Sequence, residues 1–250
     1  GEYTVILMGN IPLITKQHLK DILHYVMLKN MNACKLKAGF IFKTEYLKDV
    51  DEVFSVDTYN LRSNDFFEVV NFDALEFVKR EISKRIFGYY LKNGVFIEDF
   101  NSCQIDANVQ IEYGCRIKKA TSILDKAKIG QNSKIAKNSI ISSSEIGTDV
   151  TIGDNVIIKN SKIGSNVKIA DGIIIEDSNI ANGCEILSGC KIFNSQIDQG
   201  VLVKEFCDIM NSNIKKGASI GIMARLIRAD VEENYEVFDG KVLIRKLEDK

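Results

Sequence analysis

The chain of 250 residues has no tryptophan, one proline (Pro12) and only two histidines, His18 and His24. It also has no excess of charge, since 33 Lys and Arg stand against 34 Asp and Glu. Neither a nucleic acid nor an anionic membrane is therefore expected as a partner. No apolar run reaches the roughly 20 residues that span a bilayer, and no export signal precedes the first strand. We expect a cytoplasmic protein.

The second part of the sequence is periodic. From residue 105, isoleucine (replaced once by Val203) recurs in steps of six, six and five residues. One set of these positions is separated by 17 residues throughout: Ile129, Ile146, Ile163, Ile180, Ile197 and Ile214. Such spacing fits neither an amphipathic helix nor an alternating strand. It is typical of a parallel β-helix of hexapeptide repeats, with three short strands per coil and about six coils in this chain.

The cysteines follow the same repeat. Cys115, Cys184, Cys190 and Cys207 each stand four residues after a repeat isoleucine, and Cys103 fits this register one unit upstream. Elsewhere the same position holds small residues such as Ser or Val, so we expect it to point inward. The repeat therefore predicts buried cysteines that act as small apolar residues, and no metal site.

The first hundred residues predict an α/β unit. A strand over 5–8 runs into Gly9 and Asn10, and Thr15 is expected to cap an amphipathic helix over 16–30. Further on we expect a strand over 38–43, a short helix or loop over 44–54, a strand over 66–72 and a helix from 73 to Gly94. Asp73 and Glu76 are predicted to form the capping box of that last helix.

Hexapeptide β-helices resemble a large acyltransferase family, usually homotrimeric, with a histidine as general base between subunits. Both histidines of this chain precede the repeat, on the flanks of the helix over 16–30. We expect them to be surface or interface residues rather than catalytic ones. Of the functions that we consider for this chain, acyl transfer with an unrecognised base is therefore the least expected.

Four segments resemble the bifunctional UDP-N-acetylglucosamine pyrophosphorylase (N-acetylglucosamine-1-phosphate uridylyltransferase) and glucosamine-1-phosphate acetyltransferase family. MGNIPLIT is similar to the family's GDxPLIT segment, and VVNFDALEFVKREISKRIFGYYLKNGVFIED to its VN segment and linker helix. IGIMARLIRADVEENY and KVLIRK are similar to two stretches of the family's left-handed β-helix. The resemblance implies a partial nucleotidyltransferase-like Rossmann-type unit over 1–72, a linker helix over 73–94 and a left-handed β-helix over 95–250.

The resemblance also implies site residues. Asn10 and Asn71 occupy the family's Mg²⁺-binding positions, with Gly9 beside the nucleotide, and Arg225, Arg228 and Lys246 fall near its sugar-phosphate site. A role for the last three as surface residues that cap the β-helix is equally open. Because Asn10 replaces an aspartate, it brings no negative charge to a metal. The expected partners are a nucleotide, a sugar phosphate and two further copies in a homotrimer.

Two departures leave the function open. The chain has no glycine-rich phosphate loop before residue 5, and it ends before the family's acetyltransferase histidine. One reading is a fragment of a longer uridylyltransferase that makes UDP-N-acetylglucosamine. The alternative is a non-catalytic trimeric β-helix that serves as a scaffold or regulatory relative. The third is the hexapeptide acyltransferase with an unrecognised base.

Overall fold

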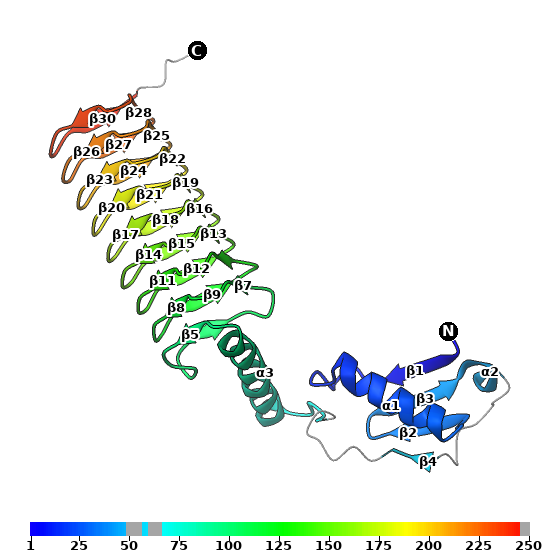
Figure 1. The fold of residues 1–250 in the computed structure, drawn as a ribbon. Helices are drawn as coiled ribbons and strands as arrows, with labels where there is room; N and C mark the ends of the chain where they lie inside the picture. Colours follow the sequence, from blue (N-terminus) through cyan, green and yellow to red (C-terminus); the bar gives the residue numbers. More distant parts are fainter. Residues whose placement is uncertain (49–56, 60–66, 246–250) are drawn as a thin grey trace. The chain divides into compact units, whose positions relative to one another are not determined.

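The computed structural model describes residues 1–48, 57–59 and 67–245 (Figure 1). It divides into two compact units, Gly1–Ile82 and Ser83–Lys250. Among the described residues, no helix combines the length and the apolar character needed to cross a bilayer.

The N-terminal unit is a small sheet with one long helix, α1 (Lys16–Leu28), beside it. The strands β1 (Tyr3–Leu7), β3 (Gly39–Lys43), β2 (Ala33–Leu36) and β4 (Asp57–Thr58) lie in that order. A one-turn helix, α2 (Thr44–Leu47), follows β3. Ile22 and Val26 of α1 are buried against Cys34 and Ile41 of the sheet. The predicted cap holds, since the Thr15 hydroxyl accepts a hydrogen bond from the His18 N–H at 3.3 Å.

The Rossmann-type unit predicted for this region is wrong. A Rossmann-type unit is an open, mostly parallel sheet whose strands are joined by crossover helices. Here β3 is the central strand, and it is antiparallel to both of its neighbours, β1 and β2. Among the described residues of this unit, the parallel pairing is confined to β2 and the two-residue strand β4. Strands β2 and β3 are joined by a hairpin at Lys37–Ala38 and not by a crossover helix.

The segment after this sheet also differs from the prediction. Residues 67–70 form no strand, and Phe66 lies outside the described residues. Helix α3 (Phe72–Lys92) is present, but Asn71 caps it instead of Asp73, since Asn71 Oδ1 accepts from the Ala74 N–H at 2.8 Å. The helix ends where expected, and Gly94 adopts a positive φ of 77°.

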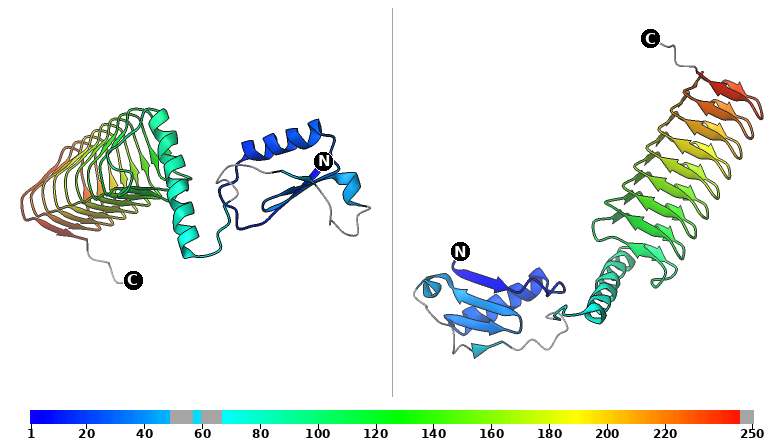
Figure 2. Two further views of the ribbon diagram at one scale, coloured as in Figure 1. Left: turned by 90° about the horizontal axis from the view of Figure 1, so that it is seen from below. Right: turned by 180° about the vertical axis from the view of Figure 1, so that it is seen from behind.

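The second unit is the predicted β-helix, and its hexapeptide repeat and left-handed coil are confirmed (Figure 1). It has about nine turns rather than six, built from three parallel sheets of eight, nine and nine strands. Figure 2 shows the coils stacked along one axis. We name the sheets face 1, face 2 and face 3, which is the order in which the chain visits them from residue 110 onward.

The strands of each face are stacked in register, one per coil. Face 1 consists of β7 (Gln110–Ile111), β10 (Lys128–Ile129), β13 (Glu145–Ile146), β16 (Lys162–Ile163), β19 (Asn179–Ile180), β22 (Gln196–Ile197), β25 (Asn213–Ile214) and β28 (Asp230–Val231). Face 2 consists of β5 (Phe96–Ile97), β8 (Arg116–Ile117), β11 (Lys134–Ile135), β14 (Thr151–Ile152), β17 (Lys168–Ile169), β20 (Glu185–Ile186), β23 (Leu202–Val203), β26 (Ser219–Ile220) and β29 (Glu236–Val237). Face 3 consists of β6 (Gln104–Ile105), β9 (Ser122–Leu124), β12 (Ile140–Ser142), β15 (Ile157–Lys159), β18 (Ile174–Glu176), β21 (Lys191–Phe193), β24 (Asp208–Met210), β27 (Arg225–Ile227) and β30 (Val242–Ile244).

The core of the β-helix is a continuous stack of the repeat isoleucines. Ile158, for example, lies between Ile141 and Ile175 in register and is fully buried. The five cysteines of the repeat are buried, as predicted. Burial raises the pKa of the Cys115 and Cys184 thiols, which keeps them protonated and unreactive.

The three corners of a coil differ in length. Four residues join face 1 to face 2, as between β13 and β14, and four join face 2 to face 3. From β12 onward only two residues, such as Asn160 and Ser161, join face 3 to face 1, and we call this the short corner. The short corner accounts for the step of five in the sequence. Its first residue has a positive φ, which suits the Asn or Asp found there in most coils.

Candidate functional site

The residues predicted to bind a metal lie together in the N-terminal unit. The Asn10 carbonyl accepts a hydrogen bond from the Val69 N–H at 2.9 Å, which places Asn71 two residues from this contact. Asn10 Oδ1 is buried and has no hydrogen-bond partner among the described residues. Gly9 is exposed, and a side chain there would meet no atom within 4 Å. The structure thus brings the two segments together, but nothing requires glycine at position 9.

These residues do not fit a Mg²⁺ site. Mg²⁺ is usually held by one or two carboxylates, whereas Asn10 and Asn71 offer only neutral amide oxygens. The Asn71 oxygen already caps α3. In the part of the chain that the structure describes, no group of three or more His, Cys, Asp or Glu side chains could hold a metal ion. We derive no chemistry from a metal here.

The residues predicted for a sugar phosphate lie near the C-terminal end of the β-helix. Arg225 points outward from β27 and pairs with Asp208 on the coil below at 3.2 Å. Arg228 is exposed at the next short corner, with a φ of 54°. Lys246 lies outside the described residues. A sugar-phosphate role for these residues stays a prediction.

The two histidines have no catalytic surroundings. His18 Nδ1 accepts a hydrogen bond from the Thr15 N–H at 3.1 Å, so this side chain completes the cap of α1. His24 is exposed on the same helix. Neither histidine belongs to the β-helix.

A hollow of about 650 Å³ runs along the short corners of successive coils of the β-helix. We call it the short-corner groove. Its walls carry amides, hydroxyls and a few charges, from Ser143, Glu145, Asn160, Ser161, Lys162, Asp177, Ser178, Asn179, Asn194, Ser195, Gln196 and Asn213. Sequence reasoning did not find this groove. The sequence did contain a signal for the groove. Each step of five residues includes a serine, and these serines recur every 17 residues from Ser144 to Ser212.

The serines of the short corner form a ladder inside the wall of the groove. Ser178 Oγ donates to the Glu176 carbonyl at 2.8 Å and accepts from the Ser195 N–H at 3.1 Å. The same pair of bonds is repeated at Ser144, Ser161, Ser195 and Ser212. Their hydroxyls hold the backbone of the coils together, so they are not available as nucleophiles.

Glu145 is the acidic group best placed in the groove, and it is held in its charged form. Its carboxylate lies 2.6 Å from Lys128 Nζ and 3.9 Å from Lys162 Nζ. The hydrogen bond from Lys128, followed by the charge of the same lysine, lowers the pKa of Glu145. A carboxylate with a lowered pKa is a weak general base. The groove can therefore bind a polar molecule through amides, whereas Glu145 is poorly suited to act as the base of a group transfer.

A second hollow of about 420 Å³ lies on the other side of face 1 and shares Glu145 and Lys162 with the first. Its floor is the stacked backbone of Gly130, Gly147 and Gly164. A side chain at Gly147 would lie 2.7 Å from the Gly164 carbonyl carbon, so the close stacking of coils explains these glycines.

Comparison with known proteins finds similarity in structure only. No protein-family profile matches the chain, and no curated protein sequence matches it. A UDP-N-acetylglucosamine acyltransferase of Francisella novicida is similar, with 18% identity over 52% of this chain and 62% of that chain, at a TM-score of 0.36. One from Bacteroides fragilis has 17% identity over 57% and 66%, at 0.30. A GDP-perosamine N-acetyltransferase variant of Caulobacter crescentus has 10% over 66% and 64%, at 0.27.

The chain thus spans less than two thirds of the length of these structures. Identities of 10–18% and TM-scores of 0.27–0.36 leave the function to be argued from the chain's own residues.

The predicted assignment to the UDP-N-acetylglucosamine pyrophosphorylase family is wrong. The predicted activity, uridylyl transfer, is wrong as well. The N-terminal unit is not a Rossmann-type nucleotidyltransferase sheet. The similar solved structures are acyltransferases. The short segments that carried the resemblance form a sheet end, a helix and β-helix coils, which many unrelated functions share.

Proposed function

We propose that this chain is a non-catalytic β-helix scaffold that associates side by side with two further copies through face 3. The observation that carries the proposal is the outward surface of this face, which is the most apolar of the three. Each strand of face 3 beyond β6 has three residues, so it turns two side chains outward instead of one.

The apolar side chains of face 3 form two stacked columns. The first column contains Ile140, Ile157 and Ile174, in register on neighbouring coils. The second column contains Phe193, Met210, Ile227 and Ile244. On face 1, by contrast, the outward positions are polar or charged in every strand, from Gln110 to Asp230. An apolar side chain gains most from burial, so face 3 is the face expected to pack against a partner.

The size of the surface favours a ring of copies. Nine strands of about three residues cover roughly 10 Å by 40 Å, or about 400 Å², whereas a stable interface buries about 800 Å² per partner. The corner between faces 2 and 3 supplies further apolar surface, because Phe206, Met223 and Phe238 there are 58–70% exposed. Face 3 of one copy against this corner of the next makes a heterologous contact, and such contacts close into a ring of three when each copy is rotated by one third of a turn.

The lack of a base supports a non-catalytic role. Transfer of an acyl group to an amine or hydroxyl needs a group that removes a proton. The sequence has no histidine after His24, and the best-placed groove carboxylate, Glu145, has a lowered pKa. The short-corner groove would then serve to hold a neutral polar molecule without changing it.

The test of the proposal places a charge on face 3. We expect the double variant Ile157→Lys/Met210→Lys to sediment as a monomer where the unchanged protein sediments as a trimer, because each lysine would have to be desolvated among apolar neighbours. Leu202→Lys is the control, since Leu202 also points outward but from face 2, beside Glu185. It should remain a trimer.

A monomeric unchanged protein at about 50 μM would contradict the association, since an interface of the usual size holds well below this concentration. Turnover of acetyl-CoA with any amino-sugar phosphate would contradict the non-catalytic role separately. The two parts of the proposal can therefore fail independently.

A further inference from the structure

Charge is distributed unevenly along the β-helix. Residues 101–170 contain ten Lys and Arg against six Asp and Glu, whereas residues 171–245 contain eight against twelve. The near-neutral total therefore conceals a basic half and an acidic half. The excess of positive charge in the first half is concentrated on face 2 and on the corner that follows it.

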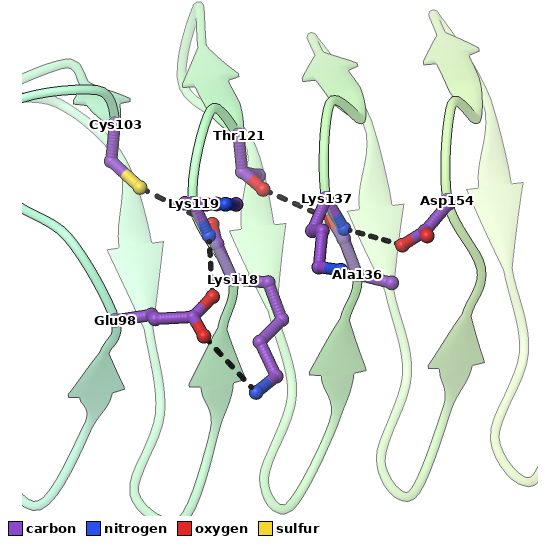
Figure 3. Close-up of polar contacts among 8 residues, drawn as sticks. All are labelled: Glu98, Cys103, Lys118, Lys119, Thr121, Ala136, Lys137 and Asp154. Carbon is purple, nitrogen blue, oxygen red and sulfur yellow. Dashed lines mark hydrogen bonds and ion pairs between the residues drawn. The ribbon is translucent and has the colours of Figure 1, made fainter.

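Five cations gather there on two neighbouring coils, and we call them the basic cluster. Arg116 of β8 and Lys134 of β11 are stacked in register. Lys118, Lys119 and Lys137 lie at the adjoining corner, as Figure 3 shows. Stacked like charges repel one another, and neighbouring strands are only about 4.8 Å apart.

The acidic side chains nearest the basic cluster are already engaged. Glu98 pairs with Lys118 at 3.5 Å and accepts the backbone N–H of Lys119 at 3.0 Å. Asp154 accepts the backbone N–H of Lys137 at 2.8 Å (Figure 3). Within the described residues, Arg116, Lys119, Lys134 and Lys137 form no ion pair, although all four are exposed. The five cations of the basic cluster face three carboxylates, Glu98, Asp99 and Asp154, so the cluster keeps a net positive charge.

We propose that the basic cluster binds a small molecule that carries two or more linked phosphate groups. Arginine and lysine in a compact group match adjacent phosphates, because each phosphate oxygen can accept from several donors. The cluster spans only two coils, which suits a short anion. A long polyanion would have to continue along the axis past Glu185 and Glu236 of the same face. Arg116 and Lys134 lie on face 2, outside the proposed contact between copies, whereas Lys118, Lys119 and Lys137 lie on the corner that this contact uses higher up the stack.

The experiment uses the full chain and inorganic pyrophosphate, titrated by calorimetry at about 20 mM and about 150 mM salt. We expect saturable binding that weakens with salt, and a loss of about tenfold or more in the variant Arg116→Gln/Lys134→Gln. The control is Lys215→Gln/Lys216→Gln, which removes the same charge from the acidic half. It should bind pyrophosphate within about twofold of the unchanged protein.

Three results would overturn the proposal. The first is no saturation by pyrophosphate at low salt. The second is an equal loss in both double variants, which would indicate a general effect of net charge. The third is binding of a long polyanion such as heparin without binding of pyrophosphate. Circular dichroism of each variant checks that the coils remain folded.

Discussion

Replacing Ile158 by alanine should destabilise the β-helix by about 2–5 kcal/mol, because the change removes buried methyl groups and leaves a cavity. Ile158 is fully buried, and its neighbours Ile141 and Ile175 are held in register by the coils above and below. They cannot move inward to fill the space without breaking their own strand pairs. Thermal unfolding should show a lower Tm for the variant, by about 2–4 °C for each kcal/mol.

The adjacent residue provides the control for this prediction. Ile157 has the same side chain, but it points outward from β15 and is only partly buried. We expect Ile157→Ala to cost less than about 1 kcal/mol in the monomer. Equal losses for Ile157→Ala and Ile158→Ala would show that the repeat isoleucines do not form the core as described. Because each coil interacts mainly with its neighbours, the loss of stability in Ile158→Ala should be local. Backbone amides of the adjacent coils should exchange their hydrogens faster, and those of distant coils should not.

The second large effect is expected at the serine ladder. Ser178→Ala removes the group that accepts the Ser195 N–H and that donates to the Glu176 carbonyl. A buried donor left without a partner costs about 1–3 kcal/mol, although the change in volume is small. The Ser195 amide should exchange its hydrogen faster in the variant than in the unchanged protein, as measured by NMR.

Ser219→Ala is the matched control, because Ser219 points outward from β26 and its side chain has no hydrogen bond in the described part of the chain. It should leave both the Tm and the exchange of Ser195 unchanged. If Ser178→Ala had no more effect than Ser219→Ala, the ladder would contribute nothing to the stacking of coils.

The β-helix could be predicted from the sequence because every coil repeats the same constraint. An inward isoleucine recurs at steps of six, six and five, and each repetition adds to the same inference. The positions of Cys115 and Cys184 followed from that register alone. The number of coils was underestimated, since the inward residue of the last four strands, β27 to β30, is leucine or valine and not isoleucine.

The N-terminal unit offered no such repetition, and there the predictions failed in part. The apolar run before Asn71 has strand composition, yet residues 67–70 form no strand. Asn71 was expected to bind a metal because a short segment resembled another family, whereas the structure uses its side chain to cap α3. An Asn before a helix is ordinarily a cap, so local chemistry was the better guide here.

The short corner has a consequence for how this protein can change in length. From Ile129 onward the coils repeat every 17 residues, and the serine ladder from Ser144 to Ser212 follows this spacing. The earlier coils repeat every 18 residues, as between Ile111 and Ile129, because their corner between faces 3 and 1 is longer. Coils of both lengths pair in register, so a residue gained or lost at this corner leaves the strands of later coils in place. An extra residue within a strand would instead turn an inward isoleucine outward. The corner between faces 3 and 1 is therefore the place where a coil can change in length.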